Sequence, residues 1–266
     1  MTIYGRMFTI CSGITYIQLA NAKVIFFNKE LLAANDLPLP YDLVREGKWT
    51  IDKLIAQTRG LYQDVNGDGV RGLEDMYGYT TYPSQNGFLV SCKTPVLSPT
   101  EDGGREITVM TGRTSSLVEQ LYSWYYESGD AFLAVSDTSK DDYYVFACPS
   151  LFSIPLSTEN LDFAGFVFEA MTYTGSYDVI PMYYEITLKG KVADSPDDME
   201  MLEIINDHLT VSFAYCYDNR QGFAHLLNSR LGFTQTEGSK DLASMYETYL
   251  PSAQARLDAI LDGFDG

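Results

Sequence analysis

The chain has 266 residues, of which 45% are hydrophobic and 20% are charged. This balance is ordinary for a globular protein and excludes a disordered or collagen-like chain, and the length predicts one or two domains. The 36 acidic and 18 basic residues give a net charge of −18. A negative field of this size repels phosphate backbones and anionic lipids, so we expect no nucleic-acid partner and consider soluble cations and neutral ligands instead.

The first part of the chain predicts extended structure followed by helices. Residues 1–27 contain β-prone runs that are separated by polar breaks. A short helix is expected from Asn28, and then a loop marked by Pro38, Pro40 and Gly47. Thr50 has the character of a helix N-cap, and the apolar residues behind it follow helical spacing. Residues 1–22 lack the unbroken apolar stretch of a secretory signal, so no signal peptide is expected in this chain.

The second part alternates between irregular and helical patterns. Residues 78–112 are rich in Gly, Thr and Ser, which favours irregular structure and short strands. Leu117, Leu121 and Trp124 lie on one helical face, and this helix is expected to end near Gly129. A strand is predicted over 145–154, and Ser195 followed by Pro196 marks a strong helix start. Further helices are expected over 161–171, 223–231 and 242–261, the last interrupted at Pro251.

Four cysteines are spread widely along the chain, at Cys11, Cys92, Cys148 and Cys216. No CxxC pair occurs, which argues against a zinc knuckle or a thioredoxin-type redox motif. Their apolar surroundings favour buried free thiols. One disulfide remains the alternative, and the sequence does not decide between the two.

The strongest local motif is the acidic, glycine-rich segment 64–75. It matches a calcium loop in which oxygen ligands come from positions 1, 3, 5, 7 and 12, with a glycine at position 6 for the sharp turn. The expected ligands are Asp64, Asn66, Asp68, the carbonyl of Val70, and Asp75. We expect a structural Ca²⁺ there, because no nucleophile or general base accompanies the loop. A plain Asn-Gly and Asp-Gly turn without an ion is the alternative.

Two further functions find little support. The loop also matches the GxGxxG pattern of dinucleotide-binding proteins. This match is rejected, because acidic side chains would face the pyrophosphate and because the preceding residues predict a helix where that motif needs a strand. Only two histidines exist, His208 and His225, and no catalytic motif occurs. Paired acids such as Asp197 and Asp198 are typical of helix caps, although a carboxylate glycosidase would also use such pairs. We therefore expect a binding protein and no enzyme.

Two segments resemble the extracellular solute-binding proteins of family 1, the lipoproteins that deliver sugars to ABC importers. The first segment contains Asn28, Lys29, Gly47, Trp49 and Thr50, and the loop 64–75 with Tyr77-Gly78 is similar to an Asp-rich loop that many members carry at that point. The second segment runs from Ile154-Pro155 to Asp207 and includes Glu169, Ser176-Tyr177, Pro181 and Tyr183-Tyr184-Glu185. Together the resembling segments cover about half of the chain.

The resemblance implies a helix-rich α/β fold of the periplasmic-binding-protein type II class, present in part. Residues 1–27 would be hinge strands and a remnant of the N-terminal lobe, and residues 28–266 would be the helix-rich second lobe. Members carry a lipoprotein signal and a complete first lobe, and a further segment where Phe132 here leads almost directly to Tyr143. The expected chain is therefore incomplete or shortened.

For function, the resemblance implies a monomeric, extracellular lipoprotein that binds a sugar or oligosaccharide and delivers it to an ABC permease. Candidate stacking residues are Trp124, Tyr173, Tyr177 and Tyr183, because sugars lie on aromatic faces. For Trp124 a place in the core is the alternative, and Trp49 is expected to pack. A calcium-stabilised cell-surface interaction module without transport function is the alternative for the whole chain.

Overall fold

The structure is a computed structural model, and it describes residues 2–7, 9–10, 12–16, 19, 22–81, 86–133, 152–155, 157–210, 212–217 and 240–265. Within these residues the protein is a mixed α/β structure that is rich in helices and contains two small sheets. This confirms the coarse fold class expected from the sequence. None of the helices in the described ranges is long and apolar enough to cross a membrane.

The first helices begin at side chains that cap them. Helix α2 spans Lys29–Ala34, and the Asn28 side chain accepts a hydrogen bond from the Leu31 amide at 3.0 Å. Helix α4 spans Ile51–Thr58, and the Thr50 hydroxyl accepts from the Lys53 amide at 3.4 Å. The start of α4 confirms Thr50 as the predicted cap, and α2 begins where a short helix was expected, with Asn28 as its cap. Between them, α3 spans Tyr41–Arg45 in a segment that was expected to be a loop.

Two short strand pairs lie beside the central helices. Strand β1 (Tyr79–Thr81) pairs in parallel with β4 (Ala131–Leu133), with Tyr79 opposite Ala131. Strand β2 (Leu97–Pro99) pairs antiparallel with β3 (Arg105–Ile107). Helix α5 (Asn86–Ser91) was not predicted, whereas α6 (Gly112–Tyr122) follows the expected pattern and continues as the π-helical turn η1 (Ser123–Glu127).

One long helical rod follows in the second half of the chain. Helix α7 (Leu161–Thr174) continues without a break through η2 (Gly175–Val179), α8 (Ile180–Met182) and η3 (Tyr183–Val192). Helix α9 (Pro196–Asp207) starts at the Ser195 cap as predicted. Helix α10 (Phe213–Tyr217) and helix α12 (Leu242–Asp265) complete the described elements.

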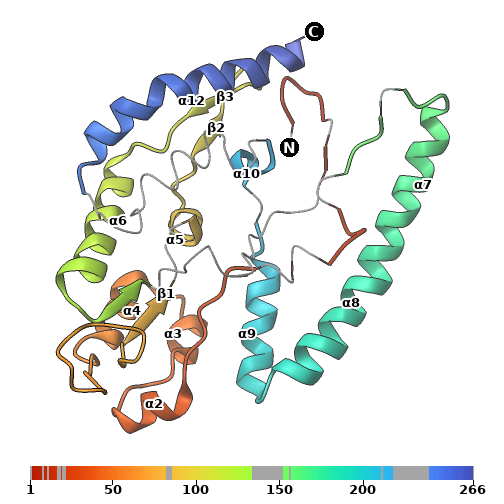
Figure 1. Ribbon diagram of the computed structural model, residues 1–266. Coiled ribbons are helices and arrows are strands. Elements are labelled where there is room, and N and C mark those ends of the chain that lie inside the picture. Colours follow the sequence, from red (N-terminus) through yellow and green to blue (C-terminus); the bar gives the residue numbers. More distant parts are fainter. Residues whose placement is uncertain are drawn as a thin grey trace.

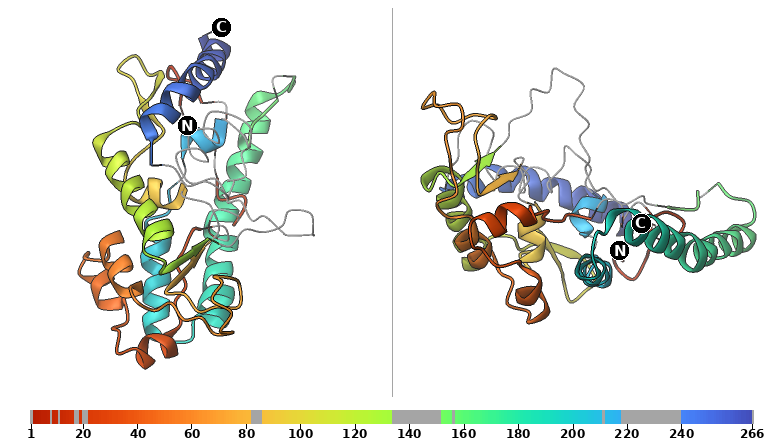
Figure 2. Two further views of the ribbon diagram at one scale, coloured as in Figure 1. Left: turned by 60° about the vertical axis from the view of Figure 1, so that its left-hand side comes forward. Right: turned by 90° about the horizontal axis from the view of Figure 1, so that it is seen from below.

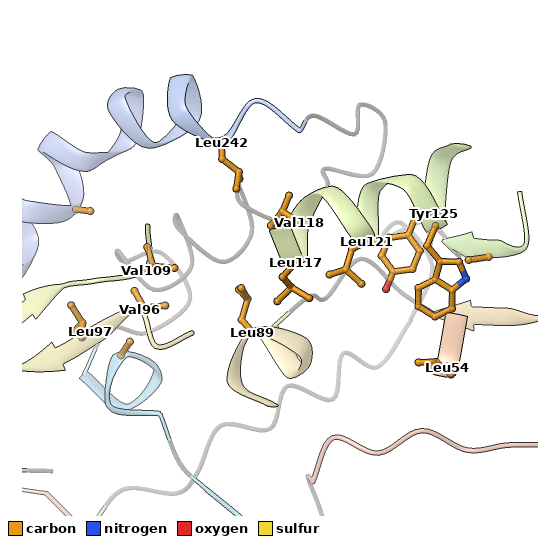
Figure 3. Close-up of a cluster of buried hydrophobic side chains, with 14 of the residues drawn as sticks. Leu54, Leu89, Val96, Leu97, Val109, Leu117, Val118, Leu121, Tyr125 and Leu242 are labelled. Atoms are coloured by element: carbon orange, nitrogen blue, oxygen red, sulfur yellow. The ribbon is translucent and has the colours of Figure 1, made fainter. Parts of the chain in front are cut away.

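The hydrophobic core lies between α4, α5, α6, the two strand pairs and α12 (Figure 3). Helix α6 contributes Leu117, Val118 and Leu121 from one face, which is the face that its helical spacing predicted. Trp49 packs against this cluster, as expected. Each fully buried aliphatic side chain contributes about 1.5 to 3 kcal/mol to folding, so this cluster is the main source of stability in the described part of the chain.

The rod formed by residues 161–192 lies apart from that core. In Figures 1 and 2 it stands on the opposite side of the molecule from α4 and α6. Helix α7 buries none of its residues. The exposed apolar side chains of the rod are Leu161, Phe163, Phe166, Val167, Met171, Tyr173, Tyr177, Val179, Met182, Ile186 and Val192.

Several predictions about secondary structure need correction. In the described part of residues 1–27, the β-structure consists of isolated bridges at Ile3–Arg6 and Ile10–Phe152, and Phe26 is 86% exposed. The extended strands expected there are therefore not formed within these described residues. Helix α12 (24 residues) passes through Pro251 without interruption, although a proline inside a helix removes one amide donor and crowds the carbonyl four residues earlier. The strand expected over 145–154 and the helix expected over 223–231 fall largely or wholly outside the described residues.

Candidate functional site

The acidic loop 64–75 is closed at its base by the two residues that flank it. Gln63 and Met76 form an isolated antiparallel bridge, with N–H···O distances of 2.9 and 3.0 Å. Gly67 and Gly69 both have positive φ, +73° and +72°, a conformation that costs glycine little and other residues more. The sharp turn expected at Gly69 is therefore present.

Most of the expected ligands now accept hydrogen bonds from the backbone of the loop. The Asp64 carboxylate accepts from the amides of Gly67 at 2.6 Å and Gly69 at 2.8 Å. The Asp75 carboxylate accepts from the amides of Val65 and Gly72 and from the Tyr62 hydroxyl, the last at 3.2 Å. These bonds point the carboxylates toward the inside of the loop and hold them there.

The donor set of this loop fits a hard cation. Every expected ligand, from Asp64, Asn66 and Asp68 to the Val70 carbonyl and Asp75, offers oxygen, which is the ligand that Ca²⁺ prefers. In the described ranges, no three side chains of His, Cys, Asp or Glu form a ready metal-binding group. Binding would therefore require the loop to exchange some backbone bonds for bonds to the ion.

Two tyrosines at the base of the loop have pKa values that burial and the nearby acidic groups raise. Partial burial raises the pKa of the Tyr62 phenol, and the hydrogen bond to Asp75 raises it further. Burial also raises the pKa of the Tyr77 phenol, and the nearby charge of Asp75 adds to the effect. Both phenols therefore stay protonated, and the Tyr62 hydroxyl remains a donor to Asp75.

The four candidate sugar-stacking residues do not form one site. Trp124 is only 2% exposed, and its indole Nε1 donates to the Thr58 hydroxyl at 3.1 Å. Its ring stacks on Tyr79 with centroids 4.5 Å apart. Trp124 is thus a core residue and not an accessible sugar contact, because the helical face that carries it is the face that packs. This corrects its proposed role in ligand binding.

The three tyrosines lie on the rod. Tyr173 and Tyr177 are 63% and 67% exposed, and their ring centroids are 4.5 Å apart. Tyr183 is half-buried and stacks on Tyr16 at 4.4 Å. The helical spacing of four residues explains the first pair. The contact of Tyr183 with Tyr16 was not predicted, since nothing in the sequence links these positions.

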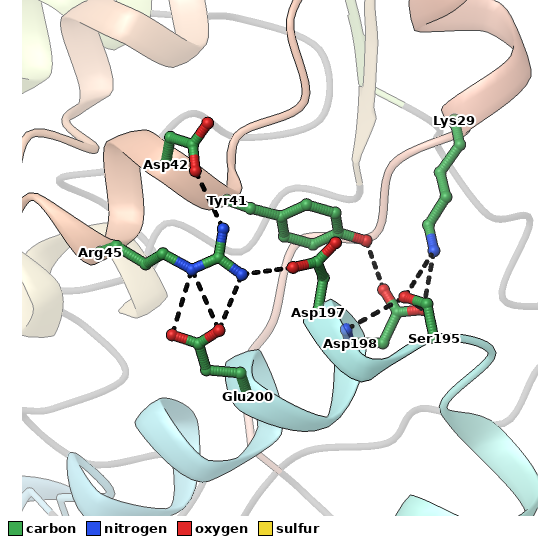
Figure 4. Close-up of polar contacts among 8 residues, drawn as sticks. All are labelled: Lys29, Tyr41, Asp42, Arg45, Ser195, Asp197, Asp198 and Glu200. Carbon is green, nitrogen blue, oxygen red and sulfur yellow. Dashed lines mark hydrogen bonds and ion pairs between the residues drawn. The ribbon is translucent and has the colours of Figure 1, made fainter.

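A polar cluster joins α2 and α3 to the first turn of α9 (Figure 4). The Asp198 carboxylate accepts from the Lys29 ammonium at 2.7 Å, from the Ser195 hydroxyl at 2.7 Å and from the Tyr41 hydroxyl. Beside it, the Arg45 guanidinium pairs with Glu200, Asp197 and Asp42. From the sequence, Asp197 and Asp198 were expected to be solvated acids at a helix start. Asp198 does lie in the first turn of α9, three residues after the Ser195 cap, but it also receives two long-range partners, Lys29 and Tyr41.

The partners in this cluster shift one another's proton affinity. Partial burial disfavours the charged Asp198, but the hydrogen bonds from Lys29, Tyr41 and Ser195 outweigh burial and hold the pKa of this carboxyl well below its usual range. The bond to Asp198, with a further one to Tyr41, raises the pKa of Lys29 above its ordinary value. Lys29 and Asp198 therefore remain oppositely charged throughout the neutral range.

The remaining candidate residues have structural surroundings. His208 caps the end of α9, and its Nδ1 lies 2.7 Å from the Ile204 carbonyl. Cys92 and Cys216 are only half-buried. Cys11, Cys148 and His225 lie outside the described residues.

A comparison of the chain with protein-family models, with curated proteins and with solved structures finds no match.

Proposed function

We propose that this chain is the solute-binding component of a carbohydrate ABC importer and comprises mostly the second lobe of a periplasmic-binding-protein type II-like fold. One observation carries the proposal. The two segments that resemble the family are far apart in sequence, yet Lys29 of the first segment bonds to Asp198 of the second at 2.7 Å. The helix-rich α/β architecture is compatible with such a lobe.

The ligand under this proposal is a sugar or oligosaccharide held against the rod. Tyr173 and Tyr177 present two exposed aromatic rings side by side. An aromatic ring offers an apolar face and, in tyrosine, a polar tip that hydrogen-bonds to hydroxyl groups. Tyr183 with Tyr16 provides a second, less exposed ring pair. In the whole protein a second lobe would contact the same ligand and stabilise the closed state.

The proposal also includes a structural Ca²⁺ in the loop 64–75. Asp64, Asn66, Asp68, the Val70 carbonyl and Asp75 would hold it, and its charge would offset the acidic side chains that crowd this loop. The resemblance further implies an extracellular lipoprotein that works as a monomer with an ABC permease as its partner. The charge of −18 argues against a nucleic-acid ligand.

Thermal unfolding at fixed calcium, with and without a panel of mono- and oligosaccharides, tests the proposal. A ligand that binds only the folded state raises the midpoint. We expect a rise with at least one saccharide, and expect the double variant Tyr173→Ala/Tyr177→Ala to lose it. Phe26→Ala removes a ring outside the rod that is 86% exposed, more than either tyrosine, and should keep the response. A cooperative transition that no saccharide moves would contradict the sugar-binding role.

The proposed Ca²⁺ site is tested in a separate experiment. Titration of calcium-free protein should raise the unfolding midpoint, and Asp64→Asn should weaken that rise because one negative oxygen ligand becomes a neutral amide. Asp194→Asn changes an exposed acid outside the loop and is the matched control. Equal calcium responses in all three proteins would overturn the proposed cation site and leave the sugar test unaffected.

A calcium-stabilised interaction module is the second candidate, and the exposed apolar face of residues 161–192 favours it. Monomeric soluble proteins rarely expose large contiguous apolar patches, and ten or more apolar side chains of the rod are exposed. A calcium response together with no response to any saccharide would favour this candidate over the importer component.

A further inference from the structure

Arg71, the eighth residue of the acidic loop, leaves the loop and reaches the turn before β4. Its guanidinium carbon lies 4.5 Å from the centroid of the Tyr62 ring, within the distance at which a cation and an aromatic face attract. On its other side the guanidinium lies against Gly129. One side chain thus spans from the loop to the Ser128–Asp130 turn.

Gly129 leaves the space in which the Arg71 guanidinium lies. Its φ is +75° and the residue is buried. A Cβ built on Gly129 would overlap the guanidinium carbon and both terminal nitrogens of Arg71, so the Arg71 side chain would have to shift. A substitution here therefore meets two separate effects, the left-handed backbone that disfavours a side chain and the displacement of Arg71. Gly60 has a similar φ of +74° but open space around it, so the two effects can be measured separately.

The residue after Gly129 connects this space to the core. The Asp130 carboxylate accepts from the Gly60 amide at 2.8 Å, and its carbonyl accepts from the amides of Gly78 at 3.0 Å and Tyr79 at 3.3 Å. The Tyr79 ring stacks on Trp124. A displacement of the turn would therefore change the surroundings of Trp124 through only two intervening residues.

Two of the expected calcium ligands lie next to Arg71 and Tyr62. Val70, whose carbonyl would bind the ion, directly precedes Arg71 in the chain. Asp75, at the last ligand position, accepts from the Tyr62 hydroxyl at 3.2 Å. When these two ligands move toward an ion, the Arg71–Tyr62 pair has to move with them.

We propose that Arg71, seated between Tyr62 and Gly129, is the positioning residue that fixes the acidic loop to the β4 end of the core, so that calcium binding in the loop changes the environment of Trp124. The second half of this statement rests on the proposed calcium site. The first half does not depend on a metal.

The metal-free half is tested by a double-mutant cycle in the presence of a chelator. Gly129→Ala and Arg71→Ala are made singly and together, and urea unfolding gives the folding equilibrium constant of each. Gly129→Ala should reduce this constant at least roughly five-fold more when Arg71 is present than when it is absent. Gly60→Ala, which introduces the same backbone strain in open space, should act equally in both backgrounds. Equal effects of Gly129→Ala in both backgrounds would overturn the seating of Arg71.

The calcium half is tested with Trp124 as the reporter. The chain has two tryptophans, so Trp49→Phe leaves Trp124 alone, and calcium is titrated with fluorescence and calorimetry in parallel. We expect the ion to shift Trp124 emission in this parent. Arg71→Lys keeps the charge but loses the flat guanidinium, so it should still bind calcium and lose most of that shift. Arg59→Lys makes the same change at an exposed position outside the loop and should keep it.

The outcomes separate the two proposals. Calcium that binds the parent without altering Trp124 emission, or an Arg71→Lys protein with an undiminished shift, would overturn the coupling. No calorimetric binding by the parent would overturn the calcium site itself, and the double-mutant cycle would still decide whether Arg71 fixes the loop.

Discussion

The Nζ of Lys29 lies 2.7 Å from Oδ2 of Asp198, a residue 169 positions further along the chain. Lys29 is the first residue of α2, and Asp198 is in the first turn of α9. Neither helix buries any of its residues, so apolar packing contributes little to this junction. The contact between the two helices therefore depends on a charged hydrogen bond, supported by Tyr41 and Ser195.

Replacing Asp198 by Asn should weaken this junction in a pH-dependent way. At pH 7 we expect a loss of about 1 to 2 kcal/mol in the free energy of unfolding, because hydrogen bonds to charged groups contribute about 1.5 to 3 kcal/mol and the exposure of the Lys29 side chain lowers this contribution. The folded pKa of Asp198 is depressed, so its contribution is fully present above the unfolded pKa of about 4 and disappears as the pH falls below it. The difference between wild type and Asp198→Asn should therefore shrink between pH 5 and pH 3, within the range of about pH 5 to 1 over which such a contribution is lost.

Urea unfolding at several pH values measures this difference. Asp194→Asn, four residues earlier and exposed, is the matched control and should change stability by less than about 0.5 kcal/mol at each pH. A loss in Asp198→Asn that stays constant down to pH 3 would mean that the carboxylate does not need its charge for the junction.

The junction shows how far sequence reasoning reaches. Helix starts depend on residues three or four positions apart, and the caps Thr50 and Ser195, together with the helix start at Asn28, were all found that way. Lys29 and Asp198 belong to two such starts, but nothing local links them. Pairings over long separations depend on how the whole chain folds, and the same holds for the parallel pair β1–β4, whose strands have three residues each.

In the candidate site, too, the features set by neighbouring residues could be predicted, and those set by long-range packing could not. The turns at Gly67 and Gly69 could be predicted because Asn-Gly and Asp-Gly favour positive φ. Whether Trp124 is buried in the core or exposed to a ligand could not be predicted, because an aromatic residue on a helical face is suited to either place. The contact between Arg71 and Gly129 was missed because the two residues are far apart in the sequence; the expected helix end near Gly129 agrees with its positive φ, but no local pattern links it to Arg71.

Replacing Thr58 by Val should destabilise the core through Trp124. Both residues are buried, and the Thr58 hydroxyl is the acceptor for the indole Nε1 at 3.1 Å. Valine keeps the shape but leaves that donor without an acceptor, which costs about 1 to 3 kcal/mol. Thr80→Val, at an exposed position of β1, should change stability by less than about 0.5 kcal/mol. Urea unfolding that gives equal values for the two variants would refute the buried bond.

Replacing Phe166 by Ser tests whether the rod is uncovered in solution. Phe166 is 68% exposed, so its removal should change the free energy of unfolding by no more than about 0.5 kcal/mol. Leu117→Ala in the core should cost about 2 to 5 kcal/mol, which sets the scale for a buried side chain. If Phe166→Ser lost as much stability as Leu117→Ala, another part of the chain, or a second molecule, would have to cover this face.

Two glycines of the rod should respond in opposite ways to alanine. Gly165 lies inside α7 with open space around it, so Gly165→Ala should stabilise the protein by about 0.5 to 1 kcal/mol through helix propensity. Gly175 has an equally helical φ of −60°, yet a Cβ there would overlap the backbone carbonyl of Gly13. The N-terminal segment crosses the rod at this point, and Tyr16 stacks on Tyr183 just beyond it.

Gly175→Ala should therefore lose the helix-propensity gain and push residues 12–16 away. Hydrogen exchange of that segment should become faster in Gly175→Ala and stay unchanged in Gly165→Ala. Equal stabilisation by both substitutions, with unchanged exchange at residues 12–16, would mean that the segment does not cross the rod at Gly175.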